Sequence, residues 1–143
     1  MEKSDVSVLI VDDEENIVKA LKVNLEMDGY VVDTACSGKE ALEKIHQKNY
    51  SIVLTDINMP EMDGLELLEK IKGQSLETIV IMITAYSTIL KVCNARNYGA
   101  SDYILKPFED LEEVDKVMNR AFETITRWEL LLKKTVQIKK KSR

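Results

Sequence analysis

Short runs of apolar, mostly β-branched residues alternate along the chain with longer segments in which apolar residues recur every three or four positions. The short runs are typical of buried strands, and the longer segments are typical of amphipathic helices. Strands are expected at 6–11, 30–35, 51–55, 78–83 and 102–105. Helices are expected at 14–27, 37–47, 64–71 and 88–98, and a last helix begins near Asp110. Five strand-then-helix units in this order predict an α/β fold with a doubly wound, five-stranded parallel sheet.

Polar residues follow four of the five predicted strands. Asp12 and Asp13 follow the first strand, and Asp56 follows the third. Thr84 follows the fourth strand and Lys106 follows the fifth. Because the carboxyl ends of parallel strands meet at one edge of the sheet, we expect three carboxylates, a hydroxyl and an ammonium group to lie close together.

Each of these residues also has a purely structural explanation. Asp13 could cap a helix that begins at Glu14, and the others could be ordinary turn or loop residues. Together, however, three clustered carboxylates repel one another, and a bound cation would offset that repulsion. Magnesium prefers such oxygen ligands, so Asp13 and Asp56 are expected to bind Mg²⁺ directly and Asp12 through a water molecule.

The same cluster is suited to phosphoryl chemistry. A metal ion and the Lys106 ammonium could neutralise phosphoryl oxygens, while the Thr84 hydroxyl donates a hydrogen bond to one of them. Asp56 is then the expected nucleophile, since an ionised carboxylate forms an acyl phosphate without a general base. The only histidine, His46, lies within a predicted helix away from this edge.

Charge is distributed unevenly over the 143 residues, whose formal net charge is −5. Residues 124–143 contain seven Lys or Arg and one Glu, a net charge of +6, which leaves −11 on the preceding 123 residues. An acidic body argues against direct nucleic-acid binding by that part of the chain. The basic end is expected to be a solvated, frayed terminus.

Cysteine use and hydropathy favour a cytoplasmic protein. Cys36 and Cys93 lie far apart among apolar neighbours, which predicts buried free thiols in a reducing compartment. The first residues lack the apolar core of a signal peptide, and no apolar run approaches the roughly 18 residues of a membrane span. We therefore expect no contact with a membrane.

Four stretches of the sequence resemble the receiver domain of bacterial two-component response regulators, in the form found in chemotaxis regulators. They are 9–14, 54–60 with Asp63-Gly64, 83–86 and 99–108. The resemblance covers about residues 5–123 and implies a flavodoxin-like sheet with strand order 2-1-3-4-5. Each motif alone is short, but their order and spacing together are specific to this family.

The resemblance also implies roles for residues at the acidic site. Asp56 corresponds to the phosphoryl acceptor, and Asp12 and Asp13 correspond to the acidic pair that binds Mg²⁺. The backbone carbonyl of Asn58 corresponds to a further metal contact. Asn58 and Tyr86 occupy positions that influence how long the phosphoryl group persists.

Two further residues match the family's switch, and a third matches the lysine of its site. Thr84 corresponds to the hydroxyl that moves toward the phosphoryl group, and Tyr103 to the aromatic residue that turns inward with it. Lys106 corresponds to the lysine of the site, and its peptide bond to Pro107 is cis in the family. The predicted helix at 88–98 departs from the family's alanine-rich pattern. In the family, partners bind the surface that this helix forms with the fifth strand and the last helix, so the identity of the partner stays open.

The resemblance implies a signalling switch rather than an enzyme with an external substrate. Asp56 would receive its phosphoryl group from a sensor histidine kinase or a phosphotransfer protein, and the domain would catalyse only its own phosphorylation and dephosphorylation. One alternative is a scaffold with the same fold that is not phosphorylated. Another is an aspartyl-phosphate hydrolase, which needs a second Asp where this chain has Asn58.

Two nucleotide-binding alternatives fit the sequence poorly. A flavodoxin needs a hydroxyl- and glycine-rich phosphate loop after the first strand, where this chain has four consecutive acidic residues. A dinucleotide-binding domain needs the Gly-x-Gly-x-x-Gly motif there, and the sequence lacks it.

Apolar residues in the last helix recur with alternating steps of four and three residues, the spacing of a coiled-coil seam. They are Leu111, Val114, Met118, Ala121, Ile125, Trp128 and Leu132. We therefore expect a receiver domain at 1–123 and an extended helix or coiled-coil linker with a basic tail at 124–143. This helix could form a homodimer and lead to an output domain outside this chain. The alternative is a long helix that folds back on its own domain.

Overall fold

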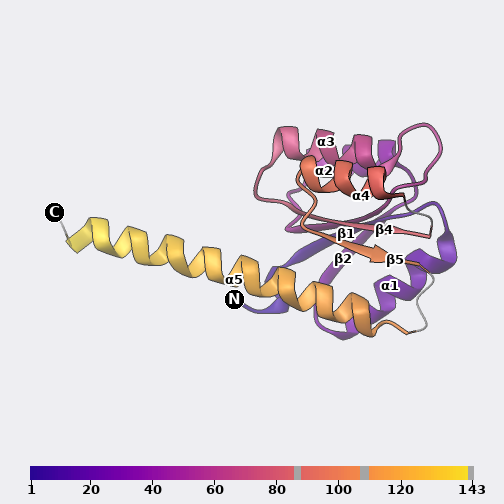
Figure 1. The fold of residues 1–143 in the computed structure, drawn as a ribbon. Helices are drawn as coiled ribbons and strands as arrows, with labels where there is room; N and C mark the ends of the chain where they lie inside the picture. The colour runs from indigo at the N-terminus through magenta and orange to yellow at the C-terminus, as the bar shows by residue number, and fades with distance from the viewer. Residues whose placement is uncertain (86–87, 107–109, 142–143) are drawn as a thin grey trace.

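The computed structural model of the chain describes residues 1–85, 88–106 and 110–141. Tyr86, Phe108 and the bond between Lys106 and Pro107 therefore lie outside the described residues. The strands form one parallel sheet in the order β2-β1-β3-β4-β5, as predicted (Figure 1). They are β1 (Ser7–Val11), β2 (Val31–Ala35), β3 (Ile52–Asp56), β4 (Ile79–Thr84) and β5 (Asp102–Leu105). The helices are η1 (Lys3–Asp5), α1 (Glu15–Met27), α2 (Gly38–Gln47), α3 (Gly64–Gln74), α4 (Ile89–Asn97) and α5 (Glu112–Lys141).

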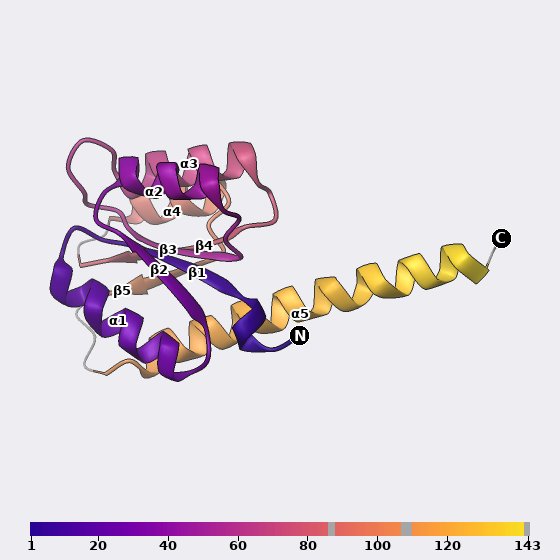
Figure 2. The same cartoon turned by 180° about the vertical axis from the view of Figure 1, so that it is seen from behind.

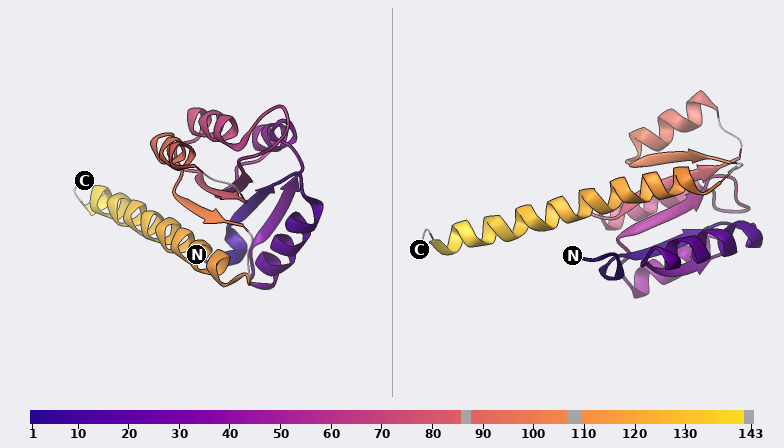
Figure 3. Two further views of the ribbon diagram at one scale, coloured as in Figure 1. Left: turned by 45° about the vertical axis from the view of Figure 1, so that its right-hand side comes forward. Right: turned by 90° about the horizontal axis from the view of Figure 1, so that it is seen from below.

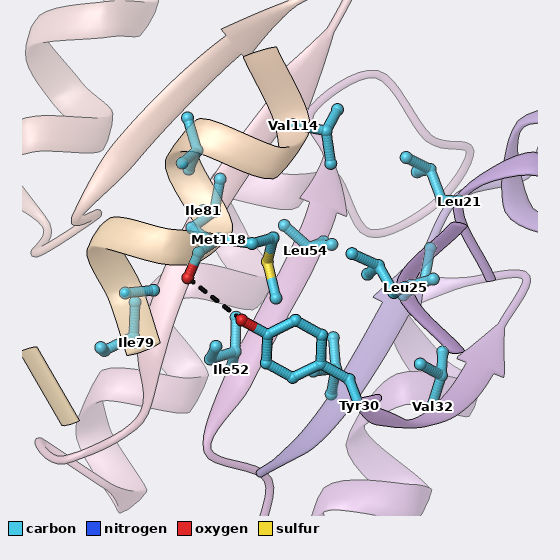
Figure 4. Packing of buried hydrophobic residues seen from close by; sticks show 14 of the residues in the cluster. Leu21, Leu25, Tyr30, Val32, Ile52, Leu54, Ile79, Ile81, Val114 and Met118 are labelled. Atoms are coloured by element: carbon cyan, nitrogen blue, oxygen red, sulfur yellow. Dashed lines mark hydrogen bonds between the residues drawn. The ribbon is translucent and has the colours of Figure 1, made fainter. Parts of the chain in front are cut away.

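Helices cover both faces of the sheet. Helices α1 and α5 lie on one face, and α2, α3 and α4 lie on the other (Figures 1 and 2). Side chains of a strand alternate between the two faces, so each central strand supplies both hydrophobic cores. In β3, for example, Ile52 and Leu54 pack in the core beneath α1 and α5 (Figure 4), whereas Val53 packs beneath α2 and α3. This burial on both faces explains the almost continuous apolar sequence of the central strands.

Most predicted helix ends agree with the structure. Ser37 caps α2 by accepting a hydrogen bond from the Glu40 backbone N–H, at 3.1 Å between Oγ and N. Gly29 and Gly99 follow α1 and α4 with positive φ angles of 107° and 99°, which glycine adopts without strain.

Two predicted features of the helices differ from the structure. Asp13 does not cap α1, because the N-cap position belongs to Glu14 and the Asp12 carboxylate accepts the Glu14 N–H at 2.9 Å. Helix α3 continues to Gln74 instead of ending at Ile71. The extra turn contains Gly73, but a helix that is already anchored by buried leucines tolerates the cost of about 1 kcal/mol for one glycine.

The two cysteines are free, as predicted, but both are exposed, so the prediction of buried thiols is wrong. Cys36 lies in the turn between β2 and α2, where its apolar neighbour Ala35 is the last residue of the strand. Cys93 lies on α4, whose only buried residue is Ala95, so its apolar neighbours face solvent as well. Local hydrophobicity therefore overestimates burial on a helix that contacts the sheet through one small residue.

Helix α5 is a single element of 30 residues. Its first half packs on the sheet through buried Val114, Val117, Met118 and Ala121, and its second half extends away from the domain (Figure 3). It does not fold back on its own domain. The basic end is helical through Lys141, and its described residues are exposed, as expected of a solvated end. None of the described helices is long and apolar enough to cross a membrane.

Candidate functional site

Three carboxylates from two neighbouring strands meet at the carboxyl edge of the sheet. Asp12 and Asp13 directly follow β1, and Asp56 is the last residue of β3. One oxygen from each of Asp12, Asp13 and Asp56 lies within 4.8 Å of the other two. The Asp12 and Asp56 residues are only 2% and 4% exposed, whereas Asp13 faces solvent. Two charged groups are thus held in a dry environment while the third remains open to water.

The Lys106 ammonium lies between the two buried carboxylates. Its Nζ is 2.6 Å from Asp12 Oδ2 and 3.4 Å from Asp56 Oδ2, and it is 3.7 Å from Glu14 Oε1 at the rim. Burial lowers the pKa of Lys106, but the hydrogen bond and charge of Asp12, together with Asp56 and Glu14, outweigh burial and raise the pKa. Lys106 therefore stays charged and offsets part of the repulsion between the carboxylates.

The environment of Asp56 favours the protonated carboxyl more than water does. Burial raises the pKa of Asp56, and the nearby Asp12 charge raises it further. Lys106 and the Asn58 backbone N–H, which donates to Asp56 Oδ1 at 3.3 Å, lower the pKa but only in part. An additional cation beside this carboxylate would stabilise its ionised form.

The loop after β3 connects Asp56 to the neighbouring strand and helix. Thr84, the last residue of β4, is completely buried, and its Oγ1 accepts a hydrogen bond from Asn58 Nδ2 at 3.2 Å. On the other side of the amide, Asn58 Oδ1 accepts a hydrogen bond from Lys91 Nζ of α4 at 3.0 Å. The Asn58 side chain therefore forms hydrogen bonds with both the Thr84 hydroxyl and Lys91 of α4.

Tyr103 lies on β5, opposite Met82 in the sheet register. It is partly buried and packs against the hydrophobic cluster beneath α2, α3 and α4. The family resemblance associates Tyr103 with the Thr84 hydroxyl, and Tyr103 lies two residues before the end of the strand that leads to Lys106.

Close backbone packing shapes the loop between Asp56 and α3. Asp63 caps α3 by accepting the Glu66 N–H at 2.8 Å, and the Gly64 N–H donates to the Ile57 carbonyl at 2.8 Å. A Cβ atom on Gly64 would lie 2.1 Å from the Asp56 carbonyl oxygen, which is impossible without displacing the loop. Gly64 is therefore a requirement of the site geometry.

Lys91 is a part of the site for which the sequence gives little signal. Gly64 belongs to the Asp63-Gly64 motif of the family resemblance, but a glycine at the start of a helix does not reveal its packing partner. The Lys91 contact has no local signature, because it joins residues 33 positions apart and most helix lysines point into solvent.

Taken together, the sheet and its acidic edge define a class of protein: a doubly wound α/β domain in which a buried aspartate belongs to a carboxylate cluster that could hold a metal ion. Residues 8–119 match the response regulator receiver domain. The chain belongs to this family, whose members are the receiver domains of two-component signalling systems.

Individual relatives agree with this assignment. Regulatory protein AtoC of Escherichia coli (strain K12) is 37% identical over 116 residues, which cover 81% of this chain and 25% of AtoC. A CheY-like receiver domain protein from Methanospirillum hungatei JF-1 superposes with a TM-score of 0.79 at 34% identity, covering 85% of this chain and 98% of that one.

A third similar protein was solved with ligands. The response regulator protein TrrA of Thermotoga maritima, in complex with Mg²⁺ and BeF, superposes with a TM-score of 0.74 at 35% identity. The match covers 81% of this chain and 98% of TrrA. In contrast, the chain spans only part of the curated relatives that it matches. It covers 25% of AtoC and 49% and 48% of two further relatives.

Proposed function

We propose that Asp56 accepts a phosphoryl group from the phosphohistidine of a sensor histidine kinase or phosphotransfer protein. The observation that carries this proposal is the burial of the Asp56 carboxylate beside Asp12, Asp13 and Lys106. Such a cluster is electrostatically costly for a structural role, but it is suited to bind a metal ion and a phosphoryl group together. The domain would act as a switch and not as an enzyme on an external substrate.

The donor set fits Mg²⁺. Asp13 and Asp56 would supply direct carboxylate ligands, the Asn58 backbone carbonyl a third, and Asp12 would act through water. The exposed position of Asp13 leaves room for the water molecules that Mg²⁺ usually keeps. When bound, the ion would neutralise phosphoryl oxygens and favour the ionised form of Asp56.

The transfer itself needs little from the protein beyond position and charge. An Asp56 oxygen attacks the phosphorus atom, a P–O bond forms, and the P–N bond breaks with its electron pair returning to the imidazole of the donor. Lys106, already directed at Asp56 Oδ2, pairs with a phosphoryl oxygen. The Thr84 hydroxyl then moves to donate to another oxygen, and Tyr103 moves with it.

This displacement would change the surface of α4, β5 and α5. The phosphoryl group can shift the population only by as much as it stabilises the active form over the resting form. Partners that bind this surface differently in the two forms would read the signal. Hydrolysis of the acyl phosphate, assisted by the domain itself, would return the switch to its resting form.

Two alternatives have weaker support. An unphosphorylated scaffold would not need Asp12, Asp13, Asp56 and Lys106 together. A hydrolase would need an acid or base near the position of Asn58, whose amide instead contacts Thr84 and Lys91.

We also propose that residues 124–143 extend the receiver at 1–123 as a dimerising helix that leads to an output domain outside this chain. Trp128 and Leu132 are 62% and 65% exposed on the projecting half of α5, although they continue the spacing of buried Met118 and Ala121. A second copy of the chain would cover this apolar stripe. We place the protein in the cytoplasm, where its kinase partner would act.

Incubation with Mg²⁺ and acetyl phosphate, followed by intact mass measurement, tests the phosphoryl-acceptor proposal. The wild type should gain the mass of one phosphoryl group, while Asp56→Asn should gain none. Omission of Mg²⁺, or the Asp13→Asn substitution, should strongly reduce the gain because the metal ligands are incomplete. Equal labelling of wild type and Asp56→Asn would refute the role of Asp56.

A further inference from the structure

A chain of two hydrogen bonds connects the buried hydroxyl of the site to helix α4. Lys91 Nζ donates to Asn58 Oδ1 at 3.0 Å, and Asn58 Nδ2 donates to Thr84 Oγ1 at 3.2 Å. We call these two contacts the Lys91 bridge. Both polar atoms of one amide side chain are used, so the orientation of the amide is determined by its partners at each end.

Lys91 occupies an unusual position on its helix. The backbone N–H of Lys91 donates to the side-chain oxygen Oγ1 of the N-cap residue Thr88 at 3.2 Å, so Lys91 lies in the first turn of α4. A cation in the first turn is disfavoured by the helix dipole. The hydrogen bond that Lys91 donates to Asn58, two residues after Asp56, offsets this cost.

The bridge is one of the contacts that hold Thr84 in its present orientation. For the Thr84 hydroxyl to approach a phosphoryl group on Asp56, the contact with Asn58 Nδ2 must lengthen or break. Because Asn58 is held by Lys91 at its other end, that movement also disturbs a contact to α4. The bridge therefore stabilises the resting form and has no equivalent stabilising role once the hydroxyl has moved.

We propose that Lys91 is a positioning residue that, through Asn58, holds the Thr84 hydroxyl in its resting orientation and so limits the active population of the unphosphorylated domain. This inference rests on the proposed phosphoryl switch at Asp56. It adds a residue of α4 to the site and connects that helix to the hydroxyl through Asn58.

A different role for Lys91 predicts the opposite change in the affinity for a phosphoryl analogue when the lysine is removed. If Lys91 were an additional cation for phosphoryl oxygens, its removal would weaken the binding of a phosphoryl analogue. If Lys91 restrains Thr84, its removal raises the fraction of active form and tightens binding, since apparent affinity scales with that fraction. The sign of one measurement therefore separates the two roles.

Beryllofluoride with Mg²⁺ is a suitable probe, and its apparent Kd can be measured by isothermal titration calorimetry. The Lys91→Met variant should bind about two- to tenfold more tightly, as expected for losing one modest hydrogen bond from the resting form only. Lys91→Arg keeps a donor cation and should stay near the wild-type value. Lys70→Met is the matched control, because Lys70 is an exposed lysine on α3 and its removal also deletes one positive charge.

A double-mutant cycle tests whether Lys91 acts through Asn58. Asn58→Ala keeps the backbone carbonyl and removes the amide, so Lys91→Met should give no further tightening in that background. Unchanged or weaker binding by Lys91→Met, or additive effects of the two substitutions, would overturn the proposal.

Spectra of the unphosphorylated protein test the bridge without any phosphoryl analogue. In ¹H–¹⁵N spectra, Lys91→Met should shift the Thr84 backbone amide and the Asn58 side-chain amide, and Lys70→Met should leave both unchanged. Unmoved signals in Lys91→Met would refute the bridge. Failure of the wild type to bind beryllofluoride would instead contradict the phosphoryl-acceptor function, so the two failures are distinguishable.

Discussion

At the scale of single residues, the site conflicts with the stability of the fold. The Asp56 carboxylate is almost fully buried near Asp12, and its pKa is raised chiefly by burial. Lys106 offsets this only partly, because it lies closer to Asp12, at 2.6 Å, than to Asp56, at 3.4 Å. Ionised Asp56 therefore destabilises the domain unless another cation is bound.

This conflict predicts that Asp56→Asn stabilises the protein at neutral pH. We expect a gain of about 1 kcal/mol, or a rise in Tm of about 4 °C, since Lys106 keeps Asp12 as its partner. A raised pKa means that the folded state binds the proton more tightly than the unfolded chain, so the wild type loses stability as pH rises through the folded pKa. The difference between wild type and variant should vanish below about pH 4, where the carboxyl is protonated in both states.

Thermal unfolding followed by circular dichroism across this pH range checks the prediction. Addition of Mg²⁺ should raise the Tm of the wild type more than that of Asp56→Asn, because the metal binds the folded wild type through the missing oxygen. A variant less stable than the wild type at pH 7 would show that the Asp56 charge is well compensated in the metal-free protein.

The acidic cluster could be predicted from the sequence because parallel strands in consecutive units end at the same edge. Strand register fixes Asp12, Asp56 and Thr84 as neighbours without any knowledge of side-chain contacts. The Lys91 contact could not be predicted, since it depends on where a helix side chain points. The exposure of Cys36 and Cys93 was mispredicted for a related reason: apolar neighbours in sequence do not establish contact with the core.

At the scale of elements, the approach of α3 to the Asp56 loop depends on a glycine. Gly64→Ala should destabilise the domain by about 3 kcal/mol, because the new Cβ would overlap the Asp56 carbonyl, and it should reduce phosphorylation as well. Gly73→Ala on the same helix is the control, since its Cβ would meet no atom within 4 Å. Urea unfolding should show a slightly stabilised control, by roughly 0.5–1 kcal/mol. Equal stability of the two variants would contradict the close packing.

Element boundaries followed from the sequence to within one to three residues. The strands were clear because the buried runs are short and separated by turns, and the capping glycines marked two helix ends. Asp13 was a plausible cap by residue type, but Glu14 occupies the N-cap position of α1 and no side chain accepts a capping hydrogen bond there. Residue preference alone therefore did not locate the N-cap.

At the scale of the whole molecule, α5 joins a packed domain to an exposed apolar stripe. The sequence predicted one continuous pattern, and the structure divides it into a core-facing half and a projecting half. The sequence pattern does not reveal this division, because the same spacing of apolar residues suits packing against a sheet and packing against a second helix. Ile125 still packs against the core, so the exposed part of the stripe begins near Trp128.

This arrangement predicts concentration-dependent dimers of the full chain. Trp128→Glu combined with Leu132→Glu should make the protein monomeric in sedimentation velocity, while its Tm in the dilute monomer should change little because both side chains are largely exposed. Lys133→Glu, on the same part of the helix, keeps both apolar residues and controls for an added negative charge. A wild type that stays monomeric with and without beryllofluoride would remove the argument for a dimerising helix.

Phosphorylation of Asp56 sets the proposed switch, and chemical mapping of the phosphoryl group determines which residue carries it. The protein is phosphorylated with Mg²⁺ and acetyl phosphate, reduced with borohydride and digested for peptide mass analysis. We predict that an acyl phosphate at Asp56 is converted to homoserine at position 56, with Asp12 and Asp13 unmodified. Homoserine at another aspartate, or none at position 56 in a phosphorylated sample, would show that Asp56 is not the phosphoryl acceptor.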